Sequence, residues 1–301
     1  MHWGQIKSIL ILSFFILDIY LFAQFLEKKE QADIGVLEQQ TSTIEEQLQA
    51  ESITYNDLPE EVSEETFISV NRHRFKEEDL NKAKPKQEQE TFIVKGSTIV
   101  SELEDPVKMN TTSVEKIMEV FHDTVYYADE YDYWNWNKAY NVIIFFQNKM
   151  DRPVYYNQNG VVIAILNDDN EMVSYVQTML GDEEALADKR QLIKPLTAIE
   201  KVYEEGELHQ GDEVSKVNIG FHTRVPFEGG VQVFAPTWRI DVNEGTNYFV
   251  NAIEGFMFLT EEEEFLKEIL TSIANNANDE EDSALSNVKE ELKDRLQQTT
   301  E

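Results

Sequence analysis

IKSILILSFFILDIYLFAQFL, residues 6–26, is the stretch that decides how this chain is organised. Only Lys7, Asp18 and Gln24 interrupt its apolar run strongly. An α-helix rises about 1.5 Å per residue, so a segment of this length spans a hydrocarbon layer of about 30 Å. We therefore predict a transmembrane helix over residues 6–26, which leaves residues 1–5 on one side of a membrane and the rest of the chain on the other.

Cleavage of this segment as a signal peptide is the alternative, which its length and end disfavour. The apolar run exceeds the ~7–15 residues of a signal h-region, and Ala23 is the only small residue near its end. Lys7 before the helix and Lys28 and Lys29 after it mildly favour a cytoplasmic domain. Long domains translocate largely regardless of charge, and this chain has no cysteine for disulfide, metal or redox chemistry. We expect the main domain outside the cell and residues 1–5 in the cytoplasm.

Asp18 is the ionisable residue in the middle of apolar neighbours at helical spacing. A carboxylate that faces lipid near the helix centre costs about 2.5–3.5 kcal/mol. Two interpretations stay open: the carboxylate contacts a partner helix, or it is neutral or reaches the headgroups as the helix tilts. In the first case the partner-binding residues in the membrane are Phe14, Asp18, Leu21, Phe22 and Phe25.

The charge of the chain restricts its ligands. Its 26 basic and 58 acidic residues give a formal net charge of −32. Nucleic-acid binding depends on basic residues that neutralise phosphates, so this balance argues against a nucleic-acid partner. It also argues against an anionic lipid surface as a ligand, apart from the bilayer around the helix itself.

The chain after residue 26 changes character three times. Residues 27–50 are polar with apolar positions at heptad-like spacing, which predicts a helical stalk or a plain amphipathic spacer. Residues 51–259 alternate short strands and turns. Residues 260–301 form an acidic tail, helical or partly disordered, in which the amphipathic stretches 265–273 and 285–296 either pack on the domain or stay mobile.

Two matching helix starts divide the domain. Thr112 with Glu115, and Thr197 with Glu200, both have the spacing of a capping box. Each predicted helix is followed by strands, at 141–147, 153–156 and 161–166 after the first and at 217–225, 231–234, 237–242 and 248–253 after the second, with turn signals at Asn159-Gly160, Gly229-Gly230 and 243–245. The pattern predicts an α+β domain of two helix-plus-antiparallel-sheet units, about 105–185 and 190–259, preceded by further strands at 66–75, 91–94 and 98–103.

A run of aromatic residues follows the first predicted helix. Tyr131, Tyr133, Trp134 and Trp136 are our candidate partner-binding residues in the outer domain, because aromatic side chains are enriched at interface centres. The alternative is that they form core and cross-strand pairs, which is the commoner use of aromatic residues in strands.

Catalytic motifs are absent from the sequence. The five histidines fall at no metal or triad spacing, and no nucleophile elbow, P-loop or dinucleotide fingerprint occurs. A hydrolase with paired carboxylates among Asp129, Glu130 and Asp132 stays open, because carboxylates meet by chance in so acidic a chain. We predict that the protein is not an enzyme and holds no cofactor or metal.

Several of these segments resemble the YycI family of membrane-anchored regulators. The likeness lies in Trp3, residues 15–18 and 24–26 around the predicted anchor, and in PTWRI (236–240) and YFVNAIEG (248–255). The last run also looks like the closing hairpin of PepSY-type modules. The likeness spans roughly residues 1–258, and residues 260–301 depart from it.

The resemblance implies a function. YycI-like proteins sit in the cell membrane beside the cell-wall sensor histidine kinase WalK (YycG) of the WalK/WalR (YycG/YycF) two-component system, together with YycH, and modulate the kinase through transmembrane-helix contacts. The resemblance also implies that the domain lies outside the cell. The alternative is an anchored extracytoplasmic enzyme or ligand-binding module of PepSY-like architecture.

Overall fold

The computed structural model describes residues 7, 12–15, 17–22, 24, 43–56, 58–59, 64–109, 113–186, 188–226, 231–243, 245–258 and 261–276. The chain divides into two units, Met1–Ser52 and Ile53–Glu301. In the first unit the described residues between 7 and 24 are helical, and α2 (Ile44–Ala50) begins behind a capping box in which Thr43 and Glu46 bond each other's backbone N–H. Across these ranges, no helix combines the length and the apolar character that a membrane crossing requires. Part of the predicted helix over 6–26 and most of the predicted stalk over 27–50 lie outside the described residues.

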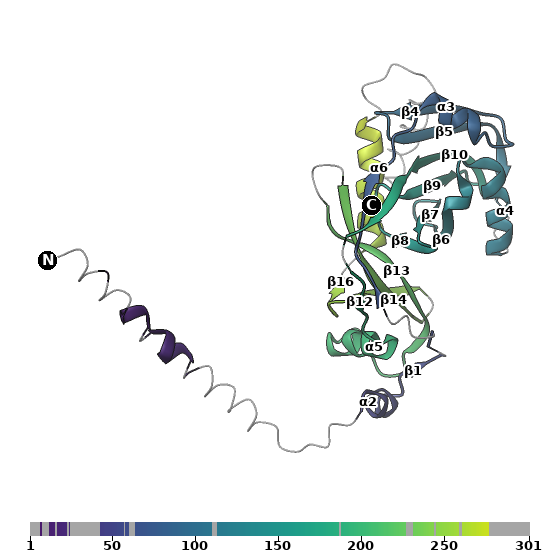
Figure 1. Ribbon diagram of the computed structural model, residues 1–301. Coiled ribbons are helices and arrows are strands. Elements are labelled where there is room, and N and C mark those ends of the chain that lie inside the picture. The colour runs from purple at the N-terminus through teal and green to yellow at the C-terminus, as the bar shows by residue number, and fades with distance from the viewer. Residues whose placement is uncertain are drawn as a thin grey trace. The chain divides into compact units, whose positions relative to one another are not determined.

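The second unit is an α+β domain built on one large mixed sheet (Figure 1). Its strands are β1 (Thr54–Tyr55), β3 (Ile68–Arg72), β4 (Gln89–Val94), β5 (Thr98–Lys108), β6 (Tyr131–Asn137), β7 (Val142–Lys149), β8 (Arg152–Tyr155), β9 (Val161–Leu166), β10 (Glu171–Thr178), β11 (Leu180–Ala185), β13 (Glu213–Pro226), β14 (Val231–Val242), β15 (Thr246–Asn251) and β16 (Met257–Phe258). A separate ladder joins β2 (Glu64–Glu65) and β12 (Arg190–Gln191). The helices are α3 (Glu77–Lys82), α4 (Val114–Thr124), the 3-10 turn η1 (Ala128–Glu130), α5 (Pro195–Glu204) and α6 (Glu262–Asn276).

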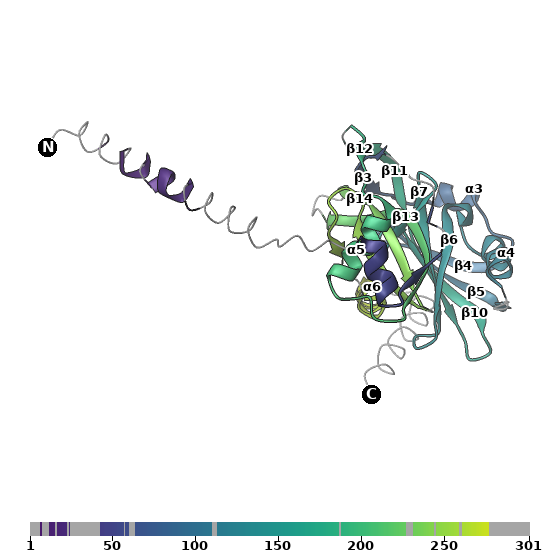
Figure 2. The same ribbon diagram turned by 90° about the horizontal axis from the view of Figure 1, so that it is seen from below.

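The first half of the sheet is an antiparallel ladder in the order β4-β5-β10-β9-β7, with β6 paired to β7. Its strands carry apolar side chains on both faces, which is why β7 and β9 read as nearly continuous apolar runs. Figures 1 and 2 show α4 on one face and α6 on the other. Ile117 and Phe121 of α4 join one core cluster, and the buried side of α6 joins the other.

The second half of the sheet centres on β13 and β14, which pair antiparallel along most of their length. Strand β14 pairs with β3 up to Phe234 and with β15 from Thr237 onward, so its neighbour changes around Pro236. Proline has no backbone N–H, so a position between two partner strands suits it. Two predicted strands, 231–234 and 237–242, are thus one strand with two neighbours. Helix α5 packs on β14 and β15.

Strand β8 joins the two halves. It pairs antiparallel with β7 and parallel with β13, where Phe221 lies opposite Val154. At Gly220 a Cβ atom would lie 2.4 Å from the ring of Tyr155, so only glycine fits against that side chain. The buried side chain of Gln147 bridges the halves as well: its Nε2 donates to the carbonyl of Leu180 at 3.1 Å and its Oε1 accepts from the N–H of Leu180 at 2.6 Å.

Several local predictions are wrong in detail. Helix α4 is capped by Ser113 instead of Thr112. Helix α5 begins at Pro195, three residues before the start that a cap at Thr197 predicts. Proline at the first helical position supplies a fixed φ and needs no N–H partner, which outweighs the weaker Thr197 signal.

A two-residue turn at Met150 and Asp151, both with positive φ, closes the hairpin of β7 and β8.

The strands that flank Asn159-Gly160 are not partners of each other, although the chain does turn there. The three-residue turn at 243–245 is confirmed: it links β14 and β15 from Val242 to Thr246. Helix α4 is followed by β6, β7, β9 and β10, and α5 by β13, β14, β15 and β16, all within one sheet. The division into two repeat units stays a prediction.

The start of the acidic tail folds back on the domain. Helix α6 covers the predicted amphipathic stretch 265–273, and its Phe265, Leu266, Ile269 and Leu270 are buried against the sheet. The first of the two open alternatives, packing on the domain, is therefore confirmed for this stretch. The second stretch, 285–296, lies outside the described residues.

Candidate functional site

The predicted aromatic surface lies on β6, which pairs only with β7 among the described strands. Tyr131 is 1% exposed, and its hydroxyl donates to the carbonyl of Thr178 at 2.7 Å. Burial raises the pKa of Tyr131 far above its ordinary value. Tyr131 is therefore a core residue, and no partner reaches it in this fold.

The other three aromatic residues of β6 are partly buried and face opposite sides of the sheet. The register of β6 against β7 shifts between Tyr133 and Asn135, so a bulge at Trp134 puts Trp136 on the same face as Tyr133. Tyr133 and Trp136 pack on the face that α4 covers, and Trp134 packs on the face that α6 covers. Trp134 therefore shares no face with Tyr133 and Trp136.

Trp134 forms one wall of a polar cleft of about 650 Å³, which we call the Trp134 cleft. The guanidinium of Arg239, from β14, lies 4.3 Å from the centroid of the Trp134 ring. Arg239 also donates twice to Asp241, from Nε to Oδ1 at 2.5 Å and from its terminal nitrogen to Oδ2 at 2.7 Å. This planar, bidentate arrangement fixes the guanidinium against the ring.

Glu262, in the first turn of α6, closes the cleft from a distant part of the sequence. Its carboxylate accepts hydrogen bonds from Trp134 Nε1 at 2.9 Å, Asn135 Nδ2 at 3.0 Å and Asn137 Nδ2 at 3.0 Å. Three side chains of β6 thus converge on one carboxylate, which holds α6 to the edge strand. Burial and the negative charge of Glu262 raise the pKa of Tyr156 beside it.

The chemistry of the Trp134 cleft is that of a paired polar network. The charged groups already have partners: Arg239 and Asp241 pair within β14, and Glu262 bonds side chains of β6. Amides and hydroxyls of Ser215, Thr246 and Asn247 complete its lining. Over the residues that the structure describes, no group of three or more His, Asp or Glu side chains is placed to hold a metal ion.

The predicted membrane-facing residues lie in the first unit, on helical backbone. Phe14, Leu21 and Phe22 are 58%, 52% and 63% exposed, and Asp18 is exposed on the same helix. Spacings of three and four residues place these four side chains on one face. Phe25 lies outside the described residues.

Sequence reasoning missed Arg239, Asp241 and Glu262. One local signal existed: Arg239 and Asp241 are two apart on a predicted strand, which puts both side chains on one face. No local signal ties Glu262 to Trp134, since 128 positions separate them.

These features define a class: an α+β domain on one large mixed sheet, preceded by an apolar helical segment whose side chains are exposed. Residues 31–253 match the family model described as YycI protein, which is well over half of the chain. The chain therefore belongs to the YycI family, which is associated with the WalK/YycG two-component system. The resemblance predicted from the sequence is confirmed.

Comparison with solved structures gives a weaker likeness. An uncharacterised protein from Eubacterium rectale ATCC 33656, known from a crystal structure at 1.45 Å, superposes with a TM-score of 0.42 at 9% identity. The match covers 70% of this chain and 91% of that one. No curated protein matches this sequence.

Proposed function

We propose that this protein is a membrane-anchored accessory regulator that modulates the sensor histidine kinase WalK together with YycH. The family match carries the proposal. Residues 6–26 serve as the single-pass anchor, with residues 1–5 in the cytoplasm and the main domain outside the cell. The exposed apolar side chains of Phe14, Leu21 and Phe22 support this, because such surfaces need a lipid or protein environment.

The anchor helix acts on the kinase through its face that carries Asp18. A kinase with two conformations responds to any partner that binds one of them more tightly, and the shift equals the difference in binding free energy. A carboxylate in a membrane helix gains more from a polar partner in an adjacent helix than from lipid. Phe14, Leu21, Phe22 and Phe25 supply the packing surface around it.

The outer domain contributes a second contact at the edge strand β6. Tyr133 and Trp136 keep part of their surface exposed, and the outer edge of β6 has no strand partner among the described residues. An edge strand with aromatic side chains suits pairing with another domain. An anchored enzyme or ligand-binding module is the alternative function, and it requires no contact with the kinase.

An anchor swap tests the proposal. Residues 6–26 are replaced by an unrelated membrane helix of equal length, and membrane insertion is confirmed. We expect loss of co-purification with the kinase and a change in kinase-dependent transcription, with Asp18→Leu giving part of both effects. Leu12→Ala on the same helix is the matched control. Unchanged co-purification and transcription after the swap would refute an anchor-based mechanism.

A further inference from the structure

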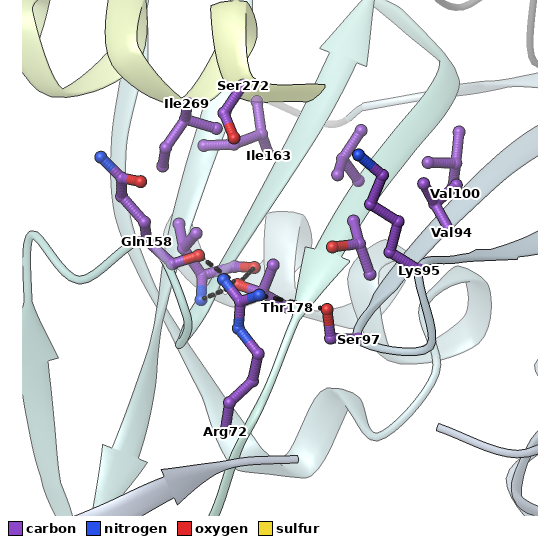
Figure 3. A pocket seen from close by; sticks show the side chains of 13 residues that line it. Arg72, Val94, Lys95, Ser97, Val100, Gln158, Ile163, Thr178, Ile269 and Ser272 are labelled. Atoms are coloured by element: carbon purple, nitrogen blue, oxygen red, sulfur yellow. Dashed lines mark hydrogen bonds between the residues drawn. The ribbon is translucent and has the colours of Figure 1, made fainter. Parts of the chain in front are cut away.

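A second cavity lies in the outer domain, away from the Trp134 cleft. It has a volume of about 70 Å³ and sits between α6 and the first half of the sheet, with Ile269 and Ser272 of α6 on one side (Figure 3). The buried side chains of Val100, Val161 and Ile163 form its inner wall. This inner end is apolar.

The mouth of the cavity carries positive charge. Arg72, the last residue of β3, and Lys95, in the turn between β4 and β5, both line it (Figure 3). Arg72 donates hydrogen bonds to the side-chain oxygens of Asn159 and Ser97, both neutral groups. Burial and the like charge of Arg74 lower the pKa of Arg72.

This charge is unusual in its setting. The chain has 58 acidic residues against 26 basic ones, yet within the described ranges no carboxylate pairs with Arg72. Glu268, on α6, bonds Gln158 Nε2 at 2.8 Å and does not line the cavity. A guanidinium that burial partly desolvates gains most from an anionic partner with two oxygens.

We propose that this cavity binds a small amphipathic carboxylate, whose head group pairs with Arg72 and whose short alkyl chain lies among Val100, Val161 and Ile163 under α6. The volume of about 70 Å³ suits a chain of a few methylene groups, since a single water molecule needs only about 10–15 Å³ of such space. The ligand comes from solution, because a domain in a chain of net charge −32 is repelled from anionic lipid.

The test uses the full-length chain in nanodiscs of neutral lipid, with hexanoate as the probe and hexylamine as its charge-reversed control. Ligand-observed NMR measures binding against empty nanodiscs. We expect saturable binding of hexanoate and not of hexylamine. From butanoate to hexanoate, binding tightens by up to about fourfold per methylene, and it stops tightening once the cavity is full.

Two arginine variants locate the head group. Arg72→Gln is expected to weaken hexanoate binding by about tenfold to hundredfold, the loss of a charge-assisted hydrogen bond. Arg74→Gln is the matched control: it removes the same charge two residues away, lines no part of the cavity and is expected to leave binding unchanged. Ser272→Phe, on the exposed side of α6, is expected to block entry of the ligand's alkyl chain into the cavity. Circular dichroism checks that the domain stays folded.

Three results would overturn the proposal. Equal binding of hexanoate and hexylamine would show an unspecific apolar site, and equal loss in Arg72→Gln and Arg74→Gln would show bulk charge alone. Competition by anionic lipid, seen as weaker hexanoate binding in nanodiscs that contain phosphatidylglycerol, would assign the site to a lipid head group instead of a free carboxylate.

Discussion

The two faces of the first half-sheet are covered by helices of different kinds. Helix α4 lies inside the segment that matches the YycI family, and α6 lies beyond its end at residue 253. Under α4 the contact is aromatic: the rings of Phe121 and Phe145 stack with centroids 3.8 Å apart. Under α6, three aliphatic side chains pack beside Phe265, whose ring meets Phe146 and Tyr156 edge to face. This contact leaves the 70 Å³ cavity and is held at one end by the polar bonds of Glu262.

This difference separates a rigid part of the core, under α4, from a part under α6 that can rearrange. A stacked aromatic pair at full burial leaves little room for rearrangement. A helix held by four apolar side chains and a network at one end can shift with a smaller loss of contact. We therefore expect α4 to determine whether the domain folds, and α6 to determine the local stability of the second face.

The largest expected effect is at Phe121. Phe121→Ala removes a fully buried ring from the stack with Phe145 and is expected to lower the free energy of unfolding by about 3–5 kcal/mol. Denaturant unfolding measures this. Val114→Ala, at a position 47% exposed on the same helix, is the control and should stay near the parent value. A small effect at Phe121 would remove the distinction between the two faces.

The matching change on the other face is Leu266→Ala. Leu266, in α6, is fully buried against the sheet, and its truncation is expected to lower the free energy of unfolding by about 2–5 kcal/mol. We expect faster amide hydrogen exchange in α6 with protection in α4 retained, because the loss loosens one face only. Lys267→Ala, one residue along on the exposed side, is the control. Equal loss of protection in both helices would mean that the two faces unfold together.

His222, on β13, makes the stability of the domain depend on pH. Its ring stacks on Phe258 with centroids 4.5 Å apart, and burial lowers its pKa to about 4. The unfolded chain binds a proton near pH 6.5 and the folded one does not, so stability is retained above pH 6.5 and lost as pH falls towards 4. The free energy of unfolding is therefore expected to be lower by about 2 kcal/mol at pH 5 than at pH 7. His222→Phe should flatten that part of the unfolding curve, and an unchanged difference between pH 7 and pH 5 would contradict the assignment.

Much of the fold follows from local pattern. The apolar runs of β7 and β9, the turn at 243–245 and the start of α4 to within one residue were all predictable, because each depends on residues next to one another. The start of α5 was wrong because Pro195 outweighs Thr197. The family likeness was predictable from the segments PTWRI and YFVNAIEG.

The sites were less predictable, since they depend on segments far apart in the sequence. Alternation along β6 indicated that some aromatic residues face the core, but the bulge at Trp134 that returns Trp136 to the face of Tyr133 leaves no local signal. Arg72 and Lys95 meet at one cavity only because β3 and the β4–β5 turn come together in space. The net charge of −32 gave no indication that two basic residues line one cavity.

The smallest expected effect is at Glu262, and it addresses how α6 is held. Glu262→Gln replaces one carboxylate oxygen with an NH₂ group, so one oxygen is left to accept from the three donors Trp134, Asn135 and Asn137. Donor against donor forms no bond, and the charge assistance is lost, so we expect a cost of about 1–2 kcal/mol. Glu264→Gln removes the same charge from an exposed position on α6 and is the control. Hydrogen exchange should accelerate at the start of α6 in the first variant alone. If both variants accelerate hydrogen exchange equally, the negative charge of the first turn holds α6 in place, and the converging hydrogen bonds at the Trp134 cleft do not.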